Sequence, residues 1–448
     1  MLSKPDIFNA LRKKLSGVTV INIVTVGLLT LFVKGIGFGK EIIIAENFGL
    51  SELLDTFYIA ILVPSLIYSV FIGSFNSVFI PNYVSTLKFN KLIAGRFQST
   101  SFIITIGVAL LFFVISLLFT DVYLEIFFKG HTDHYYDLIK KQFYYISPCI
   151  LFWGLTSIIS GLLIIDNEFR YSSLSSVFTP ISIILCLFFL KESLGNLVLA
   201  IGTLSGSILG FIFVSIIAFK RNLIYLHKPD FVSSDIKTLF KQLPAKLSSS
   251  LLVGINPFVD QFFSAQLVVG SIAALNYGLK IPAFAIGIVG IAVGNVMLPY
   301  FSKRAVEDIL GTFNKLQSMI KQLIIFSLII TIILFFFSTT IISLFFERDA
   351  FTNSDTIIVS RVQQMYLLQI PSYIIGLIMV KFLTSINKNN FMVLTSIISL
   401  VLNICLNYIL IKQLGVYGLA LATSLVSIVN SIILYIYMNW PPKFTNYS

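Results

Sequence analysis

The chain has 448 residues, of which 57% are hydrophobic and only 11% are charged. A soluble domain carries about a quarter charged residues, so this composition excludes an ordinary soluble protein. Apolar stretches of membrane-spanning length recur from end to end, which predicts an all-α polytopic membrane protein. The net charge of +11 does not indicate nucleic-acid binding, because the basic residues flank the apolar stretches.

The apolar pattern predicts about twelve transmembrane helices. They are expected at 19–45, 53–80, 99–120, 142–165, 174–190, 196–219, 246–268, 272–300, 318–344, 362–386, 390–411 and 415–439. Residues 1–18 are expected to form an interfacial N-terminal segment and 441–448 a short tail. The longest inner loop, the cytoplasmic linker 220–245, separates an N-terminal six-helix bundle (19–219) from a C-terminal six-helix bundle (246–440).

The distribution of basic residues predicts the orientation. With a cytoplasmic N-terminus, the inner segments hold 20 of the 31 Lys and Arg, the outer segments hold seven, and four fall within spans. Basic residues gather on the cytoplasmic side of membrane proteins. We therefore expect a multi-pass protein of the bacterial cytoplasmic (inner) membrane with both termini inside.

The two halves share a pattern of spacings. Pro64 and Pro81 are 17 residues apart, as are Pro282 and Pro299. A second set of matches has a constant offset of 220 residues: Asn167, Gly195, Ala200, Thr203 and Ser207 correspond to Asn387, Gly415, Ala420, Thr423 and Ser427. An even number of helices per repeat makes the bundles parallel repeats. Transporters with this symmetry carry the substrate between the two bundles. The bundles move so that the substrate site opens to one side of the membrane and then to the other.

The stretch FVKGIGFGKEIII (32–44) places three charged residues in the first span. Lys34 and Glu41 are two helical turns apart and share a face, whereas Lys40 lies on another. Glycines between them would let the helix bend or unwind locally. The candidate hinge residues are Gly35, Gly37 and Gly39 in this stretch, and Pro64, Pro282 and Pro299 elsewhere; the alternative for the prolines is a packing kink.

Further ionisable residues lie within or at the ends of other spans: Asp55, Asp260, Lys280 and Lys381. Such a group at mid-membrane costs roughly 2.5 kcal/mol or more, so each should face a wet cavity or a partner. Lys34 and Lys280 lie too deep to reach the surface easily. Lys40 and Glu41 either line a cavity or extend to the outer surface, and Asp55 either lines it or caps the second span.

Lysines around a central cavity predict an anionic cargo, such as a phosphate or pyrophosphate, held by Lys34, Lys40, Lys280 and Lys381. The acids Glu41, Asp55 and Asp260 would either exchange ion pairs with these bases or admit a coupling ion. No metal or cofactor site is expected. The segment GIGFGK lacks the spacing of a phosphate loop and lies in a membrane span.

At these residues the sequence resembles the MurJ/MviN lipid II flippases of the MOP (multidrug/oligosaccharidyl-lipid/polysaccharide) exporter superfamily, which also contains the MATE exporters. Residues 35–71 resemble the first two helices of that family, and NYGLKIPAFAIGIVGIAVGNVMLPYFSK (276–303) is the more specific match. The resemblance implies a MOP/MATE-like fold with a V-shaped central cavity. It also implies that the bases Lys34, Lys40, Lys280 and Lys381, together with Asp55, line a cationic cavity for a lipid-linked pyrophosphate.

Two departures from the family pattern bear on the cargo. Where the family carries a pair of arginines after the helix 2 proline, this chain has Tyr68 and Ser69. The chain has room for twelve helices, whereas the peptidoglycan flippases have fourteen. We therefore expect a flippase for a polyprenyl-pyrophosphate-linked saccharide, either a lipid II-like peptidoglycan precursor or a surface-polysaccharide repeat unit.

Two other functions stay open. A cation-coupled small-molecule (MATE-like) exporter fits the same fold, although four intramembrane lysines argue against it. A membrane glycosyltransferase or glycan polymerase would need a larger outer loop than 121–141. We expect a transporter rather than an enzyme. Its expected partners are the lipid-linked saccharide and membrane lipids, with no nucleic acid, no obligate protein partner and no cofactor beyond a coupling ion.

Overall fold

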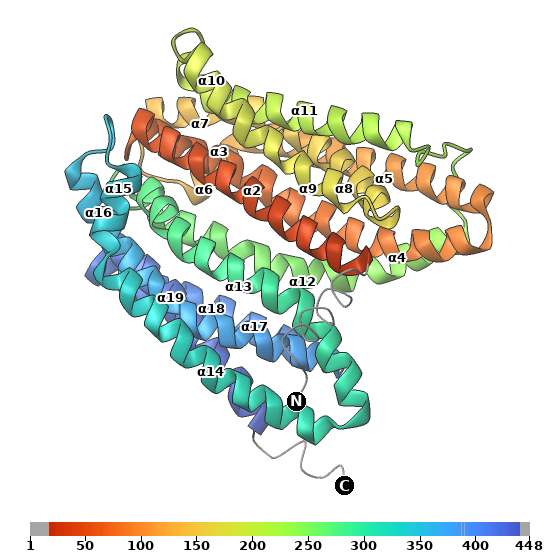
Figure 1. Ribbon diagram of the computed structural model, residues 1–448. Coiled ribbons are helices and arrows are strands. Elements are labelled where there is room, and N and C mark those ends of the chain that lie inside the picture. The colour runs from red at the N-terminus through yellow and green to blue at the C-terminus, as the bar shows by residue number, and fades with distance from the viewer. Residues whose placement is uncertain (1–17, 387, 389, 440–448) are drawn as a thin grey trace, which may run out of the picture. The chain divides into compact units, whose positions relative to one another are not determined.

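The computed structural model describes residues 18–386, 388 and 390–439, and these are organised as helices joined by short connections (Figure 1). The helices are α2 (Val18–Phe48), α3 (Glu52–Ile67), η1 (Tyr68–Ile72), α4 (Gly73–Phe89), α5 (Lys91–Leu118), α6 (Thr120–Phe127), α7 (Asp133–Ile146), α8 (Cys149–Ile165), α9 (Phe169–Leu174), η2 (Ser175–Val177), α10 (Phe178–Leu194), η3 (Gly195–Leu197), α11 (Val198–Lys220), α12 (Ser234–Ser264), α13 (Ser271–Glu307), α14 (Ile309–Phe336), α15 (Ser338–Phe346), α16 (Asn353–Leu367), α17 (Gln369–Ser385), α18 (Asn390–Leu414) and α19 (Val416–Asn439). The expected interfacial segment up to residue 17, the tail 441–448 and Asn387 lie outside the described residues.

The multi-span, all-helical architecture is confirmed. Each of the twelve predicted spans lies mainly on helical residues. Nine helical segments of the described chain are long and apolar enough to cross a membrane, and one of them, Phe169–Lys220, contains two predicted spans. Helices α2 and α12 are not among these nine.

The chain forms two compact units. The first contains Met1–Lys40, Ile67–Leu118 and Lys141–Leu247, and the second contains Glu41–Leu66, Phe119–Lys140 and Ser248–Ser448. Helix α12 begins at Ser234, inside the expected linker 220–245. Its residues up to Leu247 belong to the first unit and the rest to the second.

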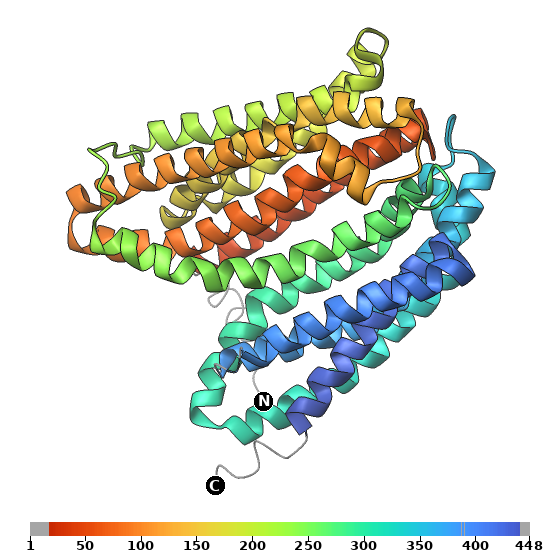
Figure 2. The ribbon, with the colours of Figure 1, turned by 180° about the vertical axis from the view of Figure 1, so that it is seen from behind.

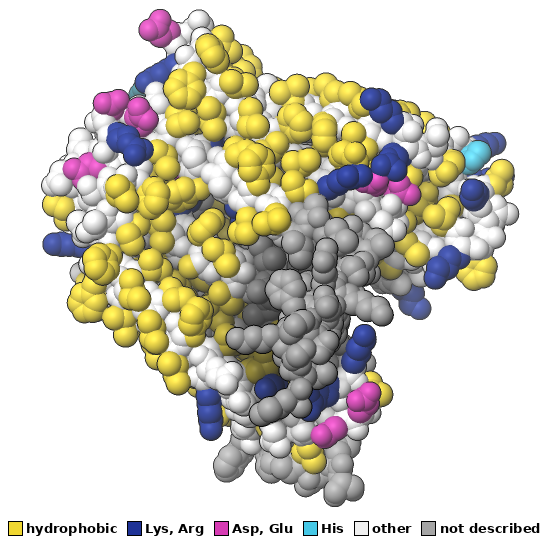
Figure 3. Space-filling model, viewed as in Figure 1, with side chains coloured by type: hydrophobic (Ala, Val, Ile, Leu, Met, Phe, Trp, Pro, Cys, Tyr) yellow, Lys and Arg dark blue, Asp and Glu magenta, His cyan; other side chains and the backbone are white. Residues whose placement is uncertain are grey.

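In the first unit, helices α10 and α11 lie side by side (Figure 1). A Cβ atom on Gly206 would lie 2.5 Å from Thr179 Cα, and one on Gly202 would lie 2.9 Å from Ile183 Cα. Small residues four apart are what allow membrane helices to approach this closely. On the face shown in Figure 3, hydrophobic side chains cover these helices and charged side chains gather near helix ends, as expected for spans in lipid.

The loop between α11 and α12, visible in Figure 2, is fastened to α5. We call residues 221–233 the strap. Three consecutive buried side chains of α5 hold its backbone. The hydrogen bonds run from Gln98 Nε2 to Leu223 O (2.9 Å), from Tyr225 N to Gln98 Oε1 (2.7 Å), from His227 N to Ser99 Oγ (2.9 Å) and from Asp230 N to Thr100 Oγ1 (2.8 Å).

In the second unit, α13 packs against α16 and α17, and α19 packs against α18 and α17. A buried cluster at one end of these helices contains Phe301, Met379, Phe382 and Leu434. The ring centroids of Phe301 and Phe382 are 5.6 Å apart. This cluster fixes the register of α13 against α17.

The internal repeat predicted from spacing is also visible in local geometry. Gly195 and Gly415, matched by the 220-residue offset, each lie just after the penultimate helix of their half. Their φ angles are 50° and 56°, in the left-handed region that favours glycine. The matched alanines Ala200 and Ala420 are both fully buried. The two halves therefore place a glycine of left-handed φ and a buried alanine at matching positions.

Candidate functional site

Lys280 and Glu41 form an ion pair inside the second unit. Lys280 Nζ in α13 lies 3.0 Å from Glu41 Oε1 near the end of α2. The Glu41 side chain is 9% exposed and that of Lys280 is 26% exposed. The Tyr58 hydroxyl of α3 donates to the other carboxylate oxygen, Glu41 Oε2, at 3.4 Å. Three helices thus hold one carboxylate and one ammonium group together.

Asp55 lies at the N-terminus of α13. Its carboxylate accepts hydrogen bonds from Gly270 N (2.6 Å) and Ala273 N (2.7 Å). A negative charge is favourable here because the first N–H groups of a helix have no partner within it. Gly270 has a φ of 92°, and a Cβ on it would lie 2.7 Å from Leu50 O, so this close approach requires glycine. Asp55 therefore caps α13, rather than its own helix.

Lys34 and Lys40 lie on α2, which is a continuous helix through the glycines between them. Both lysines are half-buried. Lys34 is two turns before Glu41 and on the same face, as predicted. The glycines Gly35, Gly37 and Gly39 have open space where a Cβ would be, so packing does not require them.

Lys381 lies far from the Glu41–Lys280 pair. Its neighbour Phe382 packs against Phe301 in the same unit. Phe301 follows Lys280 by 21 residues on α13. At 1.5 Å per residue this is about 30 Å along the helix. The two lysines therefore lie at different depths of the second unit.

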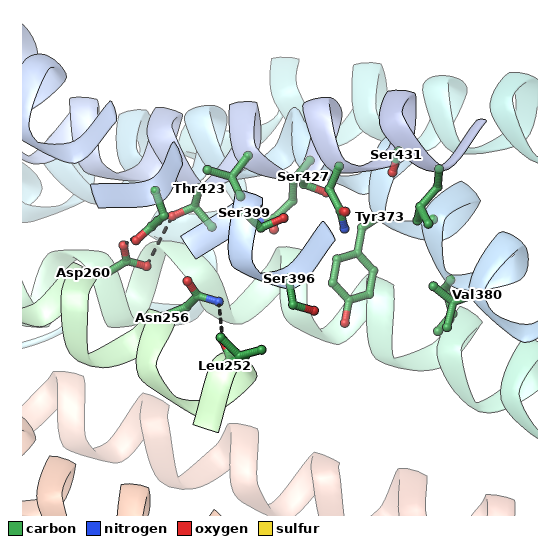
Figure 4. A pocket seen from close by; sticks show the side chains of 17 residues that line it. Leu252, Asn256, Asp260, Tyr373, Val380, Ser396, Ser399, Thr423, Ser427 and Ser431 are labelled. Atoms are coloured by element: carbon green, nitrogen blue, oxygen red, sulfur yellow. Dashed lines mark hydrogen bonds between the residues drawn. The ribbon is translucent and has the colours of Figure 1, made fainter. Parts of the chain in front are cut away.

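Asp260 of α12 lies at one end of a polar cavity in the second unit (Figure 4). Asp260 Oδ1 accepts from Asn407 Nδ2 (2.8 Å) and Asn403 Nδ2 (3.1 Å), and Oδ2 accepts from Thr423 Oγ1 (3.3 Å). Its partners are therefore neutral amide and hydroxyl groups from α18 and α19. One carboxylate surrounded by groups that can also present oxygen atoms suits a proton or a single monovalent cation.

The cavity has a volume of about 410 Å³ and extends from Asp260 between α12, α17, α18 and α19. Eleven of the 17 residues that line it are polar or charged, and the side chains labelled in Figure 4 reach it from all four helices. The polar lining residues beside the Asp260 cluster are Asn256, Gln369, Tyr373, Ser396, Ser399, Ser427, Asn430 and Ser431. Asn256 Oδ1, Gln369 Nε2 and Asn430 Oδ1 have no hydrogen-bond partner in the described part of the chain. Buried amides need partners, so the cavity is built to hold water or a polar guest.

The candidate hinge prolines lie inside helices. Pro64 is buried in α3, and a π-helical turn, η1, follows four residues later at Tyr68–Ile72. A proline removes a backbone donor, and such turns often mark functional positions in helices. Pro282 is buried within α13. Pro299 is on the same helix, with its side chain outside the described ones.

Sequence reasoning missed three side chains of these clusters. In the sequence, Tyr58 is one aromatic residue of an apolar span, and nothing distinguishes it from its neighbours. Asn403 and Asn407 could have been identified from their spacing, because amides four residues apart share one face of an otherwise apolar helix. Within the described residues, no group of three or more His, Cys, Asp or Glu side chains could hold a metal ion.

Comparisons with known proteins show the family of this chain. The family described as "Lipid II flippase MurJ" matches residues 44–445. A probable lipid II flippase MurJ from Buchnera aphidicola subsp. Schizaphis graminum is 27% identical over 426 residues, covering 92% of this chain and 82% of that protein. The lipid II flippase MurJ of Thermosipho africanus is 28% identical over 412 residues, covering 91% and 83%.

Solved structures agree on the fold. A lipid II flippase MurJ in an inward closed conformation matches with a TM-score of 0.82 and 27% identity, covering 93% of this chain and 87% of that one. An inward-facing MATE family transporter of the MOP superfamily matches with a TM-score of 0.73 at 14% identity, covering 92% and 97%, and shows the fold alone. The predicted resemblance is confirmed: the chain belongs to the MurJ family of lipid II flippases, which are membrane transporters rather than enzymes.

Proposed function

We propose that this protein carries a polyprenyl-pyrophosphate-linked saccharide, lipid II in the first instance, across the cytoplasmic membrane by alternating access. The observation that carries the proposal is the Lys280–Glu41 pair, a lysine held inside a membrane-embedded unit by one carboxylate. An ionised pair away from bulk water is costly to desolvate, and ionisable groups inside membranes usually mark a functional site. The names of the relatives, which describe lipid II flippases, support this cargo.

The pair supplies an exchangeable anion site. An ammonium group has three donors, and Glu41 engages one of them. A pyrophosphate oxygen competes with the Glu41 carboxylate for Lys280 and is favoured by its higher charge. Lys34, two turns along α2 from Glu41, and Lys40 add positive charge on that helix. Lys381, at a different depth, would contact the anionic head group at another stage of transport.

The polar cavity around Asp260 favours cation coupling as the driving step. A bound proton or monovalent cation would neutralise Asp260 and change its bonds to Asn403, Asn407 and Thr423. The same observation supports the alternative function, a cation-coupled small-molecule exporter.

Asp260→Asn keeps the shape of the group but removes its charge. We expect transport by this variant to lose its dependence on the cation or proton gradient; unchanged dependence would exclude Asp260 as the coupling residue.

The orientation proposed from the basic residues places both termini and the strap in the cytoplasm. Reporter fusions test it. A reporter active only in the cytoplasm should work after residue 448 and within the strap, and should fail within the α6–α7 connection.

The cargo is tested by complementation in cells depleted of their own lipid II flippase, with variants at matched membrane expression. Wild type should restore growth, and Lys280→Ala and Lys34→Ala should not. Lys140→Ala is the control, because Lys140 of α7 also pairs with an acid, Asp121 of α6 at 2.6 Å, but this pair is more exposed than the Lys280–Glu41 pair. Failure of well-expressed wild type would exclude lipid II and leave another lipid-linked glycan.

A second variant separates binding from structure. Glu41→Gln combined with Lys280→Met removes both charges and leaves no unpaired ion. If the pair serves only to stabilise the fold, this double variant should complement. We expect it to be stably expressed and inactive, because the anion has lost its lysine.

A further inference from the structure

An apolar groove in the first unit, apart from the polar sites described above, has the features of a lipid site. It has a volume of about 490 Å³ and is lined by α5, α8, α11 and the strap. Phe102, Ile103, Phe211 and Phe219 supply much of its wall, and Leu226 and Pro229 of the strap cover one side. The exposed fractions of Ile103, Phe219 and Leu226 are 44%, 61% and 67%, so the groove is open along its length.

The groove is a fixed feature because the strap is held in place. Four hydrogen bonds between the strap backbone and the side chains of Gln98, Ser99 and Thr100 fasten the strap to α5. The imidazole of His227 also packs directly on Gly95, where even a Cβ would collide with it. A wall fixed by backbone bonds keeps its shape whether or not the groove is filled.

Two basic residues adjoin lining residues of the groove in the sequence. Lys220 directly follows the lining residue Phe219, and Lys228 lies between the lining residues His227 and Pro229. Both lysines are exposed. Lys220 ends the helical segment Phe169–Lys220, which is long and apolar enough to cross a membrane, and Lys228 lies in the strap that follows. An apolar groove with two exposed lysines next to its lining, at the edge of a span, matches one acyl chain and the head group of an anionic lipid.

We propose that this groove binds an anionic phospholipid, with an acyl chain between α5 and α11 and the phosphate between Lys220 and Lys228. The occupant would tie the strap, and with it the start of α12, to the surface of the membrane. This inference does not depend on the cargo or on the coupling residue.

The test is lipid binding to the purified, delipidated full-length protein, measured by native mass spectrometry. The probes are phosphatidylglycerol and phosphatidylcholine with identical acyl chains. Wild type should prefer phosphatidylglycerol. Lys220→Gln and Lys228→Gln should each weaken that preference by about five-fold, the contribution of one basic side chain near an anionic surface. Lys412→Gln, in α18 of the other unit, is the matched control and should keep the preference.

A second variant tests the groove itself. Ser215→Trp places a large side chain in the lining of α11 and should reduce binding of both lipids while leaving the melting temperature unchanged. Equal binding of the two lipids by wild type would overturn the proposal, as would an unchanged preference in Lys220→Gln/Lys228→Gln. A polyprenyl phosphate that displaces phosphatidylglycerol from wild type but not from Ser215→Trp would also overturn it, since the groove would then serve the cargo.

Discussion

The carboxylate of Asp55 accepts a hydrogen bond from the backbone N–H of Gly270 at 2.6 Å, and a second from Ala273 at 2.7 Å. The contact joins the start of α3 to the start of α13, more than two hundred residues later. Asp55 is 2% exposed, so water cannot easily replace its oxygen atoms. Asp55, which the sequence suggested as a residue lining the cavity, therefore holds α3 and α13 together.

Asp55→Ala is expected to lower the free energy of unfolding by about 2–3 kcal/mol, because two buried N–H groups lose their acceptor. Asp55→Asn should cost less, since one oxygen remains. Asp308→Ala is the control: Asp308 caps α14 by accepting from Gly311 N at 2.7 Å, but is exposed. That change should cost about 1 kcal/mol. Circular dichroism of denaturant unfolding in detergent measures both, and equal losses would contradict the structural role of Asp55.

The Glu41–Lys280 pair should be energetically coupled. Glu41→Gln and Lys280→Met each leave one charge without its partner, and each should lower stability by about 1–2 kcal/mol. The double variant should cost less than the sum, with a coupling of about 1 kcal/mol. The same cycle on Asp121 and Lys140, whose side chains are 66% and 33% exposed, should give less than about 0.5 kcal/mol. Similar couplings for the two pairs would mean that Glu41 and Lys280 are solvated.

The spans and the repeat could be predicted from the sequence because they follow from local patterns. Hydropathy is read along one helix, and a repeat is read from spacing, so neither requires knowledge of tertiary contacts. Gly195 and Gly415 illustrate this, since each position needs a left-handed residue whatever packs around it. The start of α12 was less predictable. Residues 234–245 are polar enough to resemble a linker, yet Ile236 and Leu239 are buried in the core of the first unit.

The partners of the charged residues could not be predicted, because they come from distant parts of the chain. Helical periodicity related Glu41 to Lys34, whereas the fold pairs Glu41 with Lys280. Asp55 and Asp260 were expected either to exchange ion pairs with lysines or to admit a coupling ion. In the structure Asp55 accepts from backbone N–H groups, and Asp260 accepts from amides and a hydroxyl. Composition identifies which groups are costly to bury, but only packing determines what compensates each of them.

The strap should depend on Gln98. This side chain is fully buried and bonds both a carbonyl and an N–H of the strap. Gln98→Ala leaves those groups unsatisfied, at about 1–3 kcal/mol of local stability, so trypsin cleavage after Arg221 should accelerate by roughly ten-fold. Gln242→Ala is the control, because Gln242 accepts from Asn82 at an exposed position. Equal cleavage rates in the two variants would show that Gln98 does not hold the strap.

The glycines of α2 offer a test that separates stability from movement. A Cβ on Gly37 or Gly39 meets nothing within 4 Å, and glycine weakens a helix by roughly 1 kcal/mol relative to alanine. Gly37→Ala and Gly39→Ala should therefore leave stability unchanged or raise it. If α2 must bend there during transport, both substitutions should still slow transport, because the hinge has been stiffened.

Gly107→Ala in α5 is the matched control, since it also has open space around its Cβ position. Melting temperature and lipid II transport in proteoliposomes should diverge for the α2 variants and not for Gly107→Ala. Transport equal to that of Gly107→Ala would show that α2 moves as a rigid helix and that its glycines are not hinges.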